Sequence, residues 1–407
     1  MRGANVDNKS KPYVDFHGPA DFQRMRDAWG MNAVRLLVLW AGVEPASGQY
    51  DDRYLDALAQ RVEWAQGAGL LVVLDMHQDI YGEGFNGDGA PLWTCDAAHY
   101  AAFKPATQWF FDYLSPEVIA CVDGFYASPD LRAHYAESWR RVAARLAGYA
   151  NVIGFDVMNE PPWGSAGLWS FEETTLQPFY VDVVRAVREV APHFVAFLEP
   201  SASRNLGRAT GLTRFPFGDV VYAPHSYDTD AERGSGFDPA HRDFVIQKIA
   251  ALADEAKSLD AALWIGEFGG TATSPGIGAY MTAEYDGFGA VAASSMYWSY
   301  AKSNGYGLLN LDGSEKTALL DVVVRPYPER VAGDPVSFAY DAATSTFSFT
   351  YAPDDAIAAP TLLSIPARLY PGGFSVDCGG CAYDKTAGGV SITHAGAARP
   401  AVVTIRP

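Results

Sequence analysis

A single pattern repeats along roughly the first 325 residues: a short run of apolar, β-forming residues, then a longer segment whose apolar side chains have helical spacing. Strands that alternate with helices in this way, eight times over, are typical of a (β/α)8 barrel. The predicted strands are Arg2–Val6, Ala33–Trp40, Leu70–His77, Val152–Glu160, Phe194–Pro200, Val220–Tyr227, Leu263–Phe268 and Ala290–Tyr300. A doubly wound open sheet is the alternative, but no Gly-rich dinucleotide turn follows the first strand.

The character of the chain changes at Arg325-Pro-Tyr-Pro328. Helix formers become rare, and short alternating runs are separated by Gly, Pro and Asp. These runs are Val336–Tyr340, Thr346–Tyr351, Thr361–Ile365, Val390–Thr393 and Ala401–Ile405. We therefore predict an α/β chain in which a TIM barrel spans 1–325 and a small antiparallel β-sandwich spans 326–407. Because the runs show no cluster of exposed aromatics, we expect this domain to cover the flank of the barrel rather than bind glycans.

The formal charge of the chain is −18 at pH 7. Such a charge repels the phosphates of nucleic acids and of anionic lipids, so no nucleic-acid partner is expected. No apolar run approaches the ~20 residues that span a bilayer. The start of the chain, Met1–Asn5, lacks the apolar stretch of a signal peptide. We expect a secreted or extracellular monomer whose leader has been removed, and a cytoplasmic location is the alternative.

Four cysteines form two pairs in the sequence, Cys95 with Cys121 and Cys378 with Cys381. No group of His and Cys residues surrounds either pair, so a zinc site is not favoured. We expect two disulfides, which suit an exported protein, and free buried thiols are the alternative.

The run from Val152 ends in Asn159 and Glu160, followed by Pro161 and Pro162. Proline cannot donate to a β-ladder, so the strand must stop there and leave the amide and the carboxylate at its carboxyl edge. In barrels, this edge carries the chemistry. A charged residue that closes an apolar strand costs free energy unless it is paired or used. The alternative is that Glu160 only caps the strand and meets solvent.

Other predicted strands also end in polar or aromatic side chains. The set comprises His77, Asn159, Glu160, His225, Tyr227, Glu267 and Trp298. Arg35, in contrast, lies inside an otherwise apolar strand. A buried guanidinium needs an anion, and Glu267 is its expected partner. The predicted barrel thus brings two distant glutamates to one rim.

Two carboxylates in different surroundings can divide the work of glycoside hydrolysis. Glu267 beside Arg35 would stay ionised and attack carbon, whereas Glu160 beside Asn159 and His225 would keep its proton and act as an acid. Carboxyl groups roughly 5–5.5 Å apart predict retention of configuration, and a wider gap predicts inversion. One alternative is a buried Arg–Glu pair without chemistry. Another is a zinc site, with ligands drawn from Asp75, His77, Asp79 and His225. We expect neither a metal nor a cofactor.

Several motifs resemble glycoside hydrolase family 5 of clan A. They are Asn159-Glu160-Pro161, Arg35 in its Leu-rich strand, His225-Ser-Tyr227, Gly266-Glu267-Phe-Gly and Tyr297-Trp298-Ser. More narrowly, Leu74-Asp-Met-His-Gln-Asp79, Asn86-Gly-Asp-Gly-Ala-Pro91 and the Arg325-Pro-Tyr-Pro hinge look like the endoglycoceramidase branch. The likeness extends over the whole chain.

The resemblance implies roles for the individual residues. Glu160 would be the general acid/base and Glu267 the nucleophile of a retaining double displacement. Arg35 and Tyr227 would orient Glu267. The sugar-binding residues would be Lys9, His77, Asp79, Asn159, His225, Tyr227 and Trp298, with Asn159 on the 2-hydroxyl and Trp298 as the floor.

The expected substrate is a glycosphingolipid or another β-glycoside, and contact with a micelle or membrane surface is possible. Ceramide tails need an apolar surface beside the cleft, which the loop residues Trp163, Leu168, Trp169 and Phe171 would supply unless they are buried under the loop. The alternatives are a polysaccharide endo-β-hydrolase of the same family and a binding module on an inactive barrel.

Overall fold

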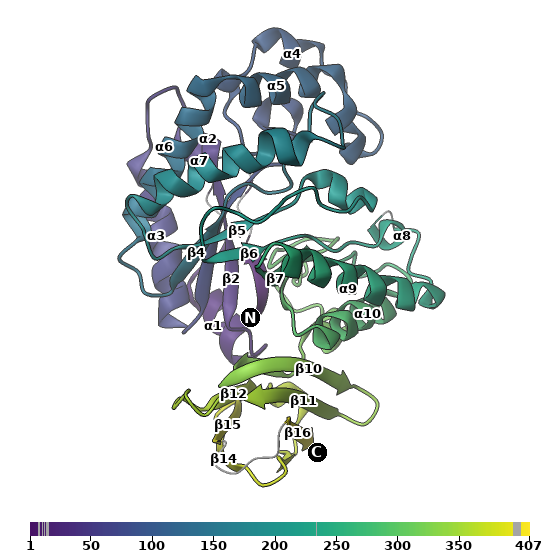
Figure 1. The fold of residues 1–407 in the computed structure, drawn as a ribbon. Coiled ribbons are helices and arrows are strands. Elements are labelled where there is room, and N and C mark those ends of the chain that lie inside the picture. Colours follow the sequence, from purple (N-terminus) through teal and green to yellow (C-terminus); the bar gives the residue numbers. More distant parts are fainter. Residues whose placement is uncertain (7–8, 10, 12, 14–15, 233, 394–399) are drawn as a thin grey trace.

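The computed structural model describes residues 1–6, 9, 11, 13, 16–232, 234–393 and 400–407. In this part of the chain, parallel strands β1 to β8 close into a barrel in chain order, and β8 returns to pair with β1 (Figure 1). The strands are β1 Arg2–Val6, β2 Ala33–Leu39, β3 Leu71–His77, β4 Val152–Asp156, β5 Val195–Leu198, β6 Val220–Tyr222, β7 Ala262–Phe268 and β8 Ser294–Tyr297. The predicted barrel is confirmed.

The helices pack around the outside of the barrel (Figure 1). They are α1 Pro19–Asp27, α2 Trp40–Val43, α3 Asp52–Gly67, α4 Ala97–Ala102, α5 Pro116–Ala127, α6 Pro129–Leu146, α7 Gln177–Arg188, α8 Thr229–Glu232, α9 Arg242–Ser258, α10 Ile277–Ala290 and α11 Thr317–Val323. Local chemistry explains their starts. Ser115 and Ser128 accept hydrogen bonds from the first turns of α5 and α6, and each precedes a proline.

Several strands are shorter than the sequence predicted, and the largest differences at the carboxyl end are in β4, which ends at Asp156, β6, which ends at Tyr222, and β8, which ends at Tyr297. The predicted extensions to Glu160, Tyr227 and Tyr300 are therefore wrong. Beyond β4, the backbone N–H groups of Val157 and Asn159 still donate to Phe197 of β5 and Met76 of β3, and the Gln78 amide donates to the carbonyls of Asn159 and Glu160. These residues therefore continue towards the barrel mouth without forming a regular ladder.

The C-terminal part folds into two antiparallel sheets, ordered β10-β11-β16-β13 and β14-β15-β12-β9. Their strands are β9 Tyr327–Arg330, β10 Gly333–Asp341, β11 Thr346–Pro353, β12 Thr361–Ser364, β13 Ser375–Asp377, β14 Ala382–Thr386, β15 Gly389–Thr393 and β16 Ala401–Arg406. Phe347, Phe349 and Ile405 are buried between them. The sequence missed β9, β13 and β14, because none of them shows an alternating apolar pattern; every residue of β14 is exposed.

The β-sandwich lies at the foot of the barrel, at the opposite end from α4 and α5 (Figure 1). The carbonyl of Gly30, between α1 and β2, accepts hydrogen bonds from Tyr327 and Ser364. Gly289 of α10 lies so close to β10 that an added Cβ would be 2.0 Å from the Phe338 carbonyl oxygen. These contacts involve the outside and the amino-terminal end of the barrel, which agrees with the expected covering role.

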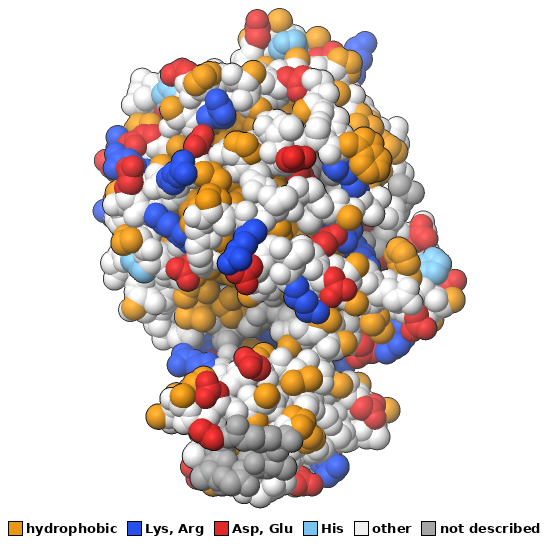
Figure 2. Space-filling view, viewed as in Figure 1, with side chains coloured by type: hydrophobic (Ala, Val, Ile, Leu, Met, Phe, Trp, Pro, Cys, Tyr) orange, Lys and Arg blue, Asp and Glu red, His pale blue; other side chains and the backbone are white. Residues whose placement is uncertain are grey.

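A long excursion follows β3 and carries the short helices η1 Glu83–Phe85, η2 Leu92–Thr94 and η3 Trp109–Leu114 as well as α4 and α5. A disulfide between Cys95 and Cys121 ties it together, and Cys378 is bonded to Cys381 in the β-sandwich. Both predicted disulfides are confirmed. Among the described residues, no helix has the length and hydropathy needed to cross a membrane. On the face drawn in Figure 2, acidic and basic side chains are interspersed.

Candidate active site

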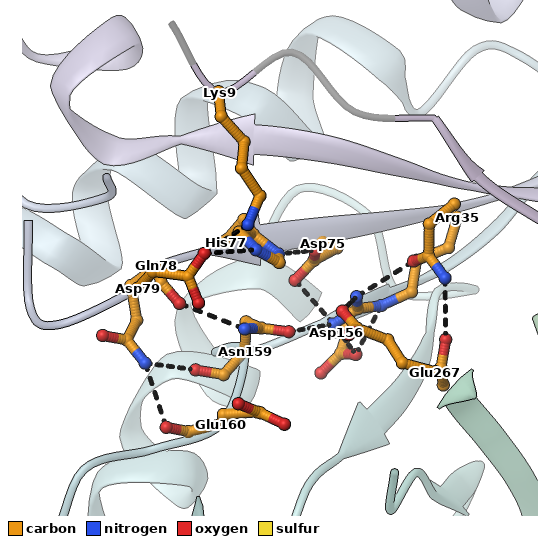
Figure 3. Close-up of polar contacts among 12 residues, drawn as sticks. Lys9, Arg35, Asp75, His77, Gln78, Asp79, Asp156, Asn159, Glu160 and Glu267 are labelled. Atoms are coloured by element: carbon orange, nitrogen blue, oxygen red, sulfur yellow. Dashed lines mark hydrogen bonds and ion pairs between the residues drawn. The ribbon is translucent and has the colours of Figure 1, made fainter. Parts of the chain in front are cut away.

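The predicted site residues that Figure 3 labels come together near the carboxyl ends of the barrel strands. One carboxylate oxygen of Glu160, one of Glu267 and one ring nitrogen of His225 lie within 4.8 Å of one another. His225 Nδ1 lies 2.8 Å from Glu160 Oε1 and 3.6 Å from Glu267 Oε2. The two glutamates, 107 positions apart in the sequence, therefore lie close together at one end of the barrel, as the sequence predicted.

Glu267 lies in β7 and accepts two well-placed hydrogen bonds. Arg35 Nη1 donates to its Oε1 at 2.7 Å, and the Tyr227 hydroxyl donates to its Oε2 at 3.0 Å. Burial raises the pKa of Glu267, while the positive charges of His225, Arg35 and His77 act in the opposite direction. The sequence argument took account of Arg35 but not of this burial. The two donors fix the orientation of the carboxylate and favour its ionised form.

Arg35 has more anionic partners than the single one predicted. Besides Glu267, its Nη2 lies 2.9 Å from Asp75 and Asp156 and 2.8 Å from Glu199. Asp75 and Asp156 come from β3 and β4, where they are adjacent in register. The signals were in the sequence, because both aspartates interrupt apolar strands and Glu199 precedes a proline as Glu160 does.

The carboxyl groups around Arg35 differ in their pKa shifts. Burial raises the pKa of Asp156 well above its ordinary value, and the neighbouring Glu199 and Asp75 add to the effect, which favours the protonated form of this carboxyl. Glu199 has a lowered pKa because His225, Arg35 and the backbone N–H of Glu160 outweigh its burial. Arg35 thus contacts four carboxyl groups, and His225 adds positive charge beside Glu199 and Glu267.

The backbone at Glu160 is held in an unusual conformation, with a φ of 40°. Its N–H donates to Glu199 Oε2 at 2.8 Å, and its carbonyl accepts from Gln78 at 2.9 Å. The neighbouring Asn159 accepts from Arg35 through Oδ1 and donates to the Gln78 carbonyl through Nδ2. Sequence reasoning did not single out Gln78 or Glu199, which fix the position of the Glu160 backbone.

Asn205 is a further residue that the sequence did not reveal. It lies in η5, Ala202–Leu206, and its amide donates to Glu160 Oε1 at 2.7 Å. This oxygen also lies beside His225 Nδ1. Glu160 is therefore held by other side chains rather than simply meeting solvent, so the strand-cap alternative is wrong. No pattern in the sequence marks Asn205, because η5 is a short helix within the connection between β5 and β6 and Asn205 is not at the end of a strand.

His77 and Lys9, which lie near each other in Figure 3, both contact the ring of Trp298. The ring of His77 stacks on Trp298 with centroids 5.2 Å apart, and the Lys9 ammonium lies 4.5 Å from the Trp298 centroid. Lys9 forms an ion pair with Asp79. Burial and Lys9 lower the pKa of His77, but Asp75 and Asp79 outweigh them and raise it to about 9, so the ring is cationic at neutral pH.

Two clusters have suitable geometry for a metal ion, Glu160 with His225 and Glu267, and His77 with Asp79 and Asp88. Of the zinc ligands considered from the sequence, His77 and Asp79 thus belong to one cluster and His225 to the other. His225 has a pKa raised well above its ordinary value, because Glu199 and Glu267 outweigh burial, so its ring is an imidazolium and does not offer a free lone pair. In the other cluster, Lys9 already supplies a positive charge.

The loop between β4 and α7 carries the aromatic residues considered for lipid contact. Trp169 is 83% exposed, whereas Phe171 is buried. Trp163 and Leu168 are partly buried. The guanidinium of Arg208 lies 4.8 Å from the Trp169 ring centroid. Of the four residues, Trp169 offers the largest accessible apolar surface and Phe171 offers none.

Comparison with known proteins decides the family. Residues 2–314 match the family described as cellulase (glycosyl hydrolase family 5), and residues 325–406 match the glycoside hydrolase family 5 C-terminal domain. The chain belongs to glycoside hydrolase family 5. This family 5 protein is therefore a glycoside hydrolase, and the resemblance seen in its motifs is confirmed.

Its relatives include named endoglycoceramidases. Endoglycoceramidase I of Rhodococcus hoagii (strain 103S) is 26% identical over 406 residues, covering 93% of this chain and 79% of the relative. The endoglycoceramidase of Cyanea nozakii is 25% identical over 411 residues, covering 86% and 77%. The structure of endo-glycoceramidase II from Rhodococcus sp. in complex with ganglioside GM3 superposes with a TM-score of 0.90 at 31% identity, covering 100% of this chain and 96% of that one.

Proposed function

We propose that this family 5 enzyme is a retaining endo-β-glycosidase that cleaves the bond between the oligosaccharide and the ceramide of glycosphingolipids. The observation that carries the proposal is the carboxylate pair, whose oxygens lie within 4.8 Å. This spacing suits the roughly 5–5.5 Å between carboxyl groups in retaining enzymes. The endoglycoceramidases among the relatives support the choice of substrate.

In the first step, Glu267 Oε attacks the anomeric carbon while Glu160 donates its proton to the glycosidic oxygen. A bond forms between Glu267 and the sugar, the bond to the ceramide oxygen breaks, and ceramide leaves with a hydroxyl group. Arg35 and Tyr227 hold the attacking carboxylate at 2.7 Å and 3.0 Å, so it needs little reorientation before the reaction.

In the second step, Glu160 is a carboxylate and takes a proton from water as the water oxygen attacks the same carbon. The bond to Glu267 breaks, and the oligosaccharide is released with its original anomeric configuration. Glu160 Oε1 is held by Asn205 and His225, which leaves its second oxygen for the leaving group and the water.

The remaining site residues bind the sugar in this proposal. Asn159, fixed by Arg35 and Gln78, lies beside Glu160 and binds the 2-hydroxyl. His77, Asp79 and Lys9 bind the outer hydroxyls, and Trp298 supplies a flat apolar face beneath the ring. The Lys9 ammonium makes a cation–π contact with Trp298 and the His77 ring stacks on it, so both hydrogen-bond donors are held beside the Trp298 ring.

The exposed Trp169 is the proposed contact for the ceramide or for the lipid surface that carries it. Trp169→Ala removes apolar area without disturbing the core. We expect kcat/KM for a lipid-linked glycan in mixed micelles to fall several-fold and that for a soluble aryl β-glycoside to remain within about two-fold. An equal loss on both substrates would exclude a specific lipid contact. We also propose that the protein is secreted and monomeric. The two disulfides support secretion, because disulfides persist in oxidising environments.

The test of function is product analysis on ganglioside GM3 by mass spectrometry. The expected products are an intact trisaccharide and ceramide, and the Glu267→Gln variant is expected to release neither. A 2-deoxy-2-fluoro glycoside with a good leaving group should become covalently attached to Glu267, which a binding module on an inactive barrel would not allow. Release of short oligosaccharides from a soluble β-glucan, with GM3 left intact, would instead establish a polysaccharide hydrolase.

A further inference from the structure

Asp88 lies in the Gly-Asp-Gly part of the loop after β3 and has no role in the function proposed so far. Its backbone pairs with that of Asp79 through two hydrogen bonds, from Asp79 N to Asp88 O at 3.0 Å and from Asp88 N to Asp79 O at 3.1 Å. Gly87 makes this approach possible, because an added Cβ would lie 1.9 Å from the Asp79 carbonyl oxygen. The loop sequence therefore holds the two aspartates side by side.

The Asp88 carboxylate is buried but unsatisfied. The residue is 7% exposed, and among the described residues its Oδ1 has no hydrogen-bond partner. The Lys9 ammonium is 3.7 Å from Asp88 Oδ2, too far for a hydrogen bond, because Lys9 is engaged with Asp79. A buried carboxylate oxygen without a donor is costly, so a ligand is expected to supply the donor.

A second unsatisfied atom lies in the same cluster. Within the part of the chain that the structure describes, His77 Nε2 is buried without a hydrogen-bond partner and is 3.7 Å from Asp79 Oδ2, while Nδ1 of the same ring is fixed by Asp75 at 2.7 Å. A ring nitrogen of His77, a carboxylate oxygen of Asp79 and a carboxylate oxygen of Asp88 lie within 4.8 Å of one another. Since the His77 ring is cationic, Nε2 is a donor. The cluster thus presents an unused acceptor close to an unused donor.

We propose that Asp88 binds the substrate, accepting a hydrogen bond from an outer hydroxyl of the hexose that lies on Trp298 while His77 Nε2 donates to the same or the adjacent hydroxyl. A sugar hydroxyl both donates and accepts, so one hydroxyl or a neighbouring pair satisfies both buried atoms at once. The ligand class is a β-hexopyranoside that carries this hydroxyl. The inference rests on the proposed function only in that the pocket binds a sugar, and it is independent of the lipid.

The competing explanation is that Asp88 serves only as a second counter-ion for Lys9. The two roles differ in their dependence on the substrate. A binding residue acts through one hydroxyl, so its removal matters only when that hydroxyl is present. A counter-ion acts through the position of Lys9, so its removal affects substrates regardless of any one hydroxyl.

The experiment is a double-mutant cycle between Asp88 and the substrate. Asp88→Asn keeps the shape of the side chain and removes its charge, and Asp88→Ser serves in case the first variant folds poorly. The control is Glu83→Gln in the same loop, whose carboxylate is already paired with Lys11 and with the Tyr13 hydroxyl. Each enzyme is assayed on an aryl β-glucoside and on its 3-, 4- and 6-deoxy analogues.

We expect Asp88→Asn to lower kcat/KM for the parent glycoside about 10- to 100-fold, the loss typical of a hydrogen bond to a charged group. For one deoxy analogue, kcat/KM of the wild type should be lower than for the parent glycoside by a similar factor. On that analogue, Asp88→Asn and the wild type should have the same kcat/KM. Glu83→Gln should follow the wild type on all four. An equal loss by Asp88→Asn on every analogue, or no loss on the parent, overturns the proposal.

The same double-mutant cycle can be measured without turnover. In this version, the Kd values of glucose and its deoxy analogues are measured for Glu267→Gln and for the double variant Glu267→Gln with Asp88→Asn. Neither readout uses a lipid. If Asp88 shows coupling to one hydroxyl but the enzyme does not cleave GM3, only the proposed substrate is overturned. If the enzyme cleaves GM3 but Asp88 shows no coupling to any hydroxyl, only the role of Asp88 is overturned.

Discussion

The charge balance around Arg35 leads to a quantitative prediction for Arg35→Met. Arg35 is fully buried, and its guanidinium contacts Asp75, Asp156, Glu199 and Glu267 within 3.1 Å. Methionine matches the apolar part of the side chain but removes the charge and the donors. The four carboxyl groups then lose their shared cation inside the barrel.

Removing one partner of a buried ion pair costs about 3–5 kcal/mol, because the other charge is left uncompensated. We expect a loss of about this size in the free energy of unfolding at pH 7. Without Arg35, the folded-state pKa values of the carboxylates rise above their unfolded values. The variant therefore regains stability relative to the wild type as pH falls towards ~5, because its folded carboxylates take up protons there.

The assay is urea unfolding followed by tryptophan fluorescence at pH 7 and pH 5. The control is Arg53→Met, at an arginine that is 93% exposed on its side chain and 3.4 Å from Asp51, where a change within about 0.5 kcal/mol is expected. The reasoning is refuted if Arg35→Met loses less than about 1 kcal/mol at pH 7, or if its deficit is the same at both pH values.

Three further predictions follow from the site and the loops. Glu160→Ala should hydrolyse activated aryl glycosides slowly and be accelerated by azide; absence of any azide effect would contradict the acid/base role. His77, with its pKa raised from 6.5 to about 9, contributes stability that is fully present below about pH 6.5 and is lost as pH rises through about 9. His77→Gln should therefore be less stable than the wild type by on the order of 3 kcal/mol at pH 6, with little difference at pH 10, and a pH-independent gap would argue against the imidazolium. From the sequence separations of 26 and 3 residues, replacing Cys95 and Cys121 by serine should cost about 3.5 kcal/mol and replacing Cys378 and Cys381 about 1.5 kcal/mol in urea unfolding. Equal losses from the two pairs would show that loop length is not the controlling factor.

The site residues that could be predicted are those marked by a local conflict in the sequence. A charged Glu160 ends an apolar run before two prolines, and Arg35 interrupts another apolar run. Each conflict is visible within about ten residues, because proline blocks the ladder and a buried charge needs a partner. Asn205 and Asp88 create no such conflict. Asn205 comes from a loop, and Asp88 gains its importance only from its pairing with Asp79.

The sequence by itself determined the barrel, its strand order and the two glutamates at its rim, since strand and helix periodicities are local and parallel strands share one carboxyl edge. It could not determine where β4, β6 and β8 end, because beyond these points only isolated backbone bonds to neighbouring strands remain, such as that from Asn159 to Met76, and side chains such as Gln78 add to them. The tertiary structure alone decided that four carboxyl groups share Arg35, and that the pKa of Asp156 is raised while that of Glu199 is lowered. These properties depend on strand register and burial, which arise only when distant segments pack together.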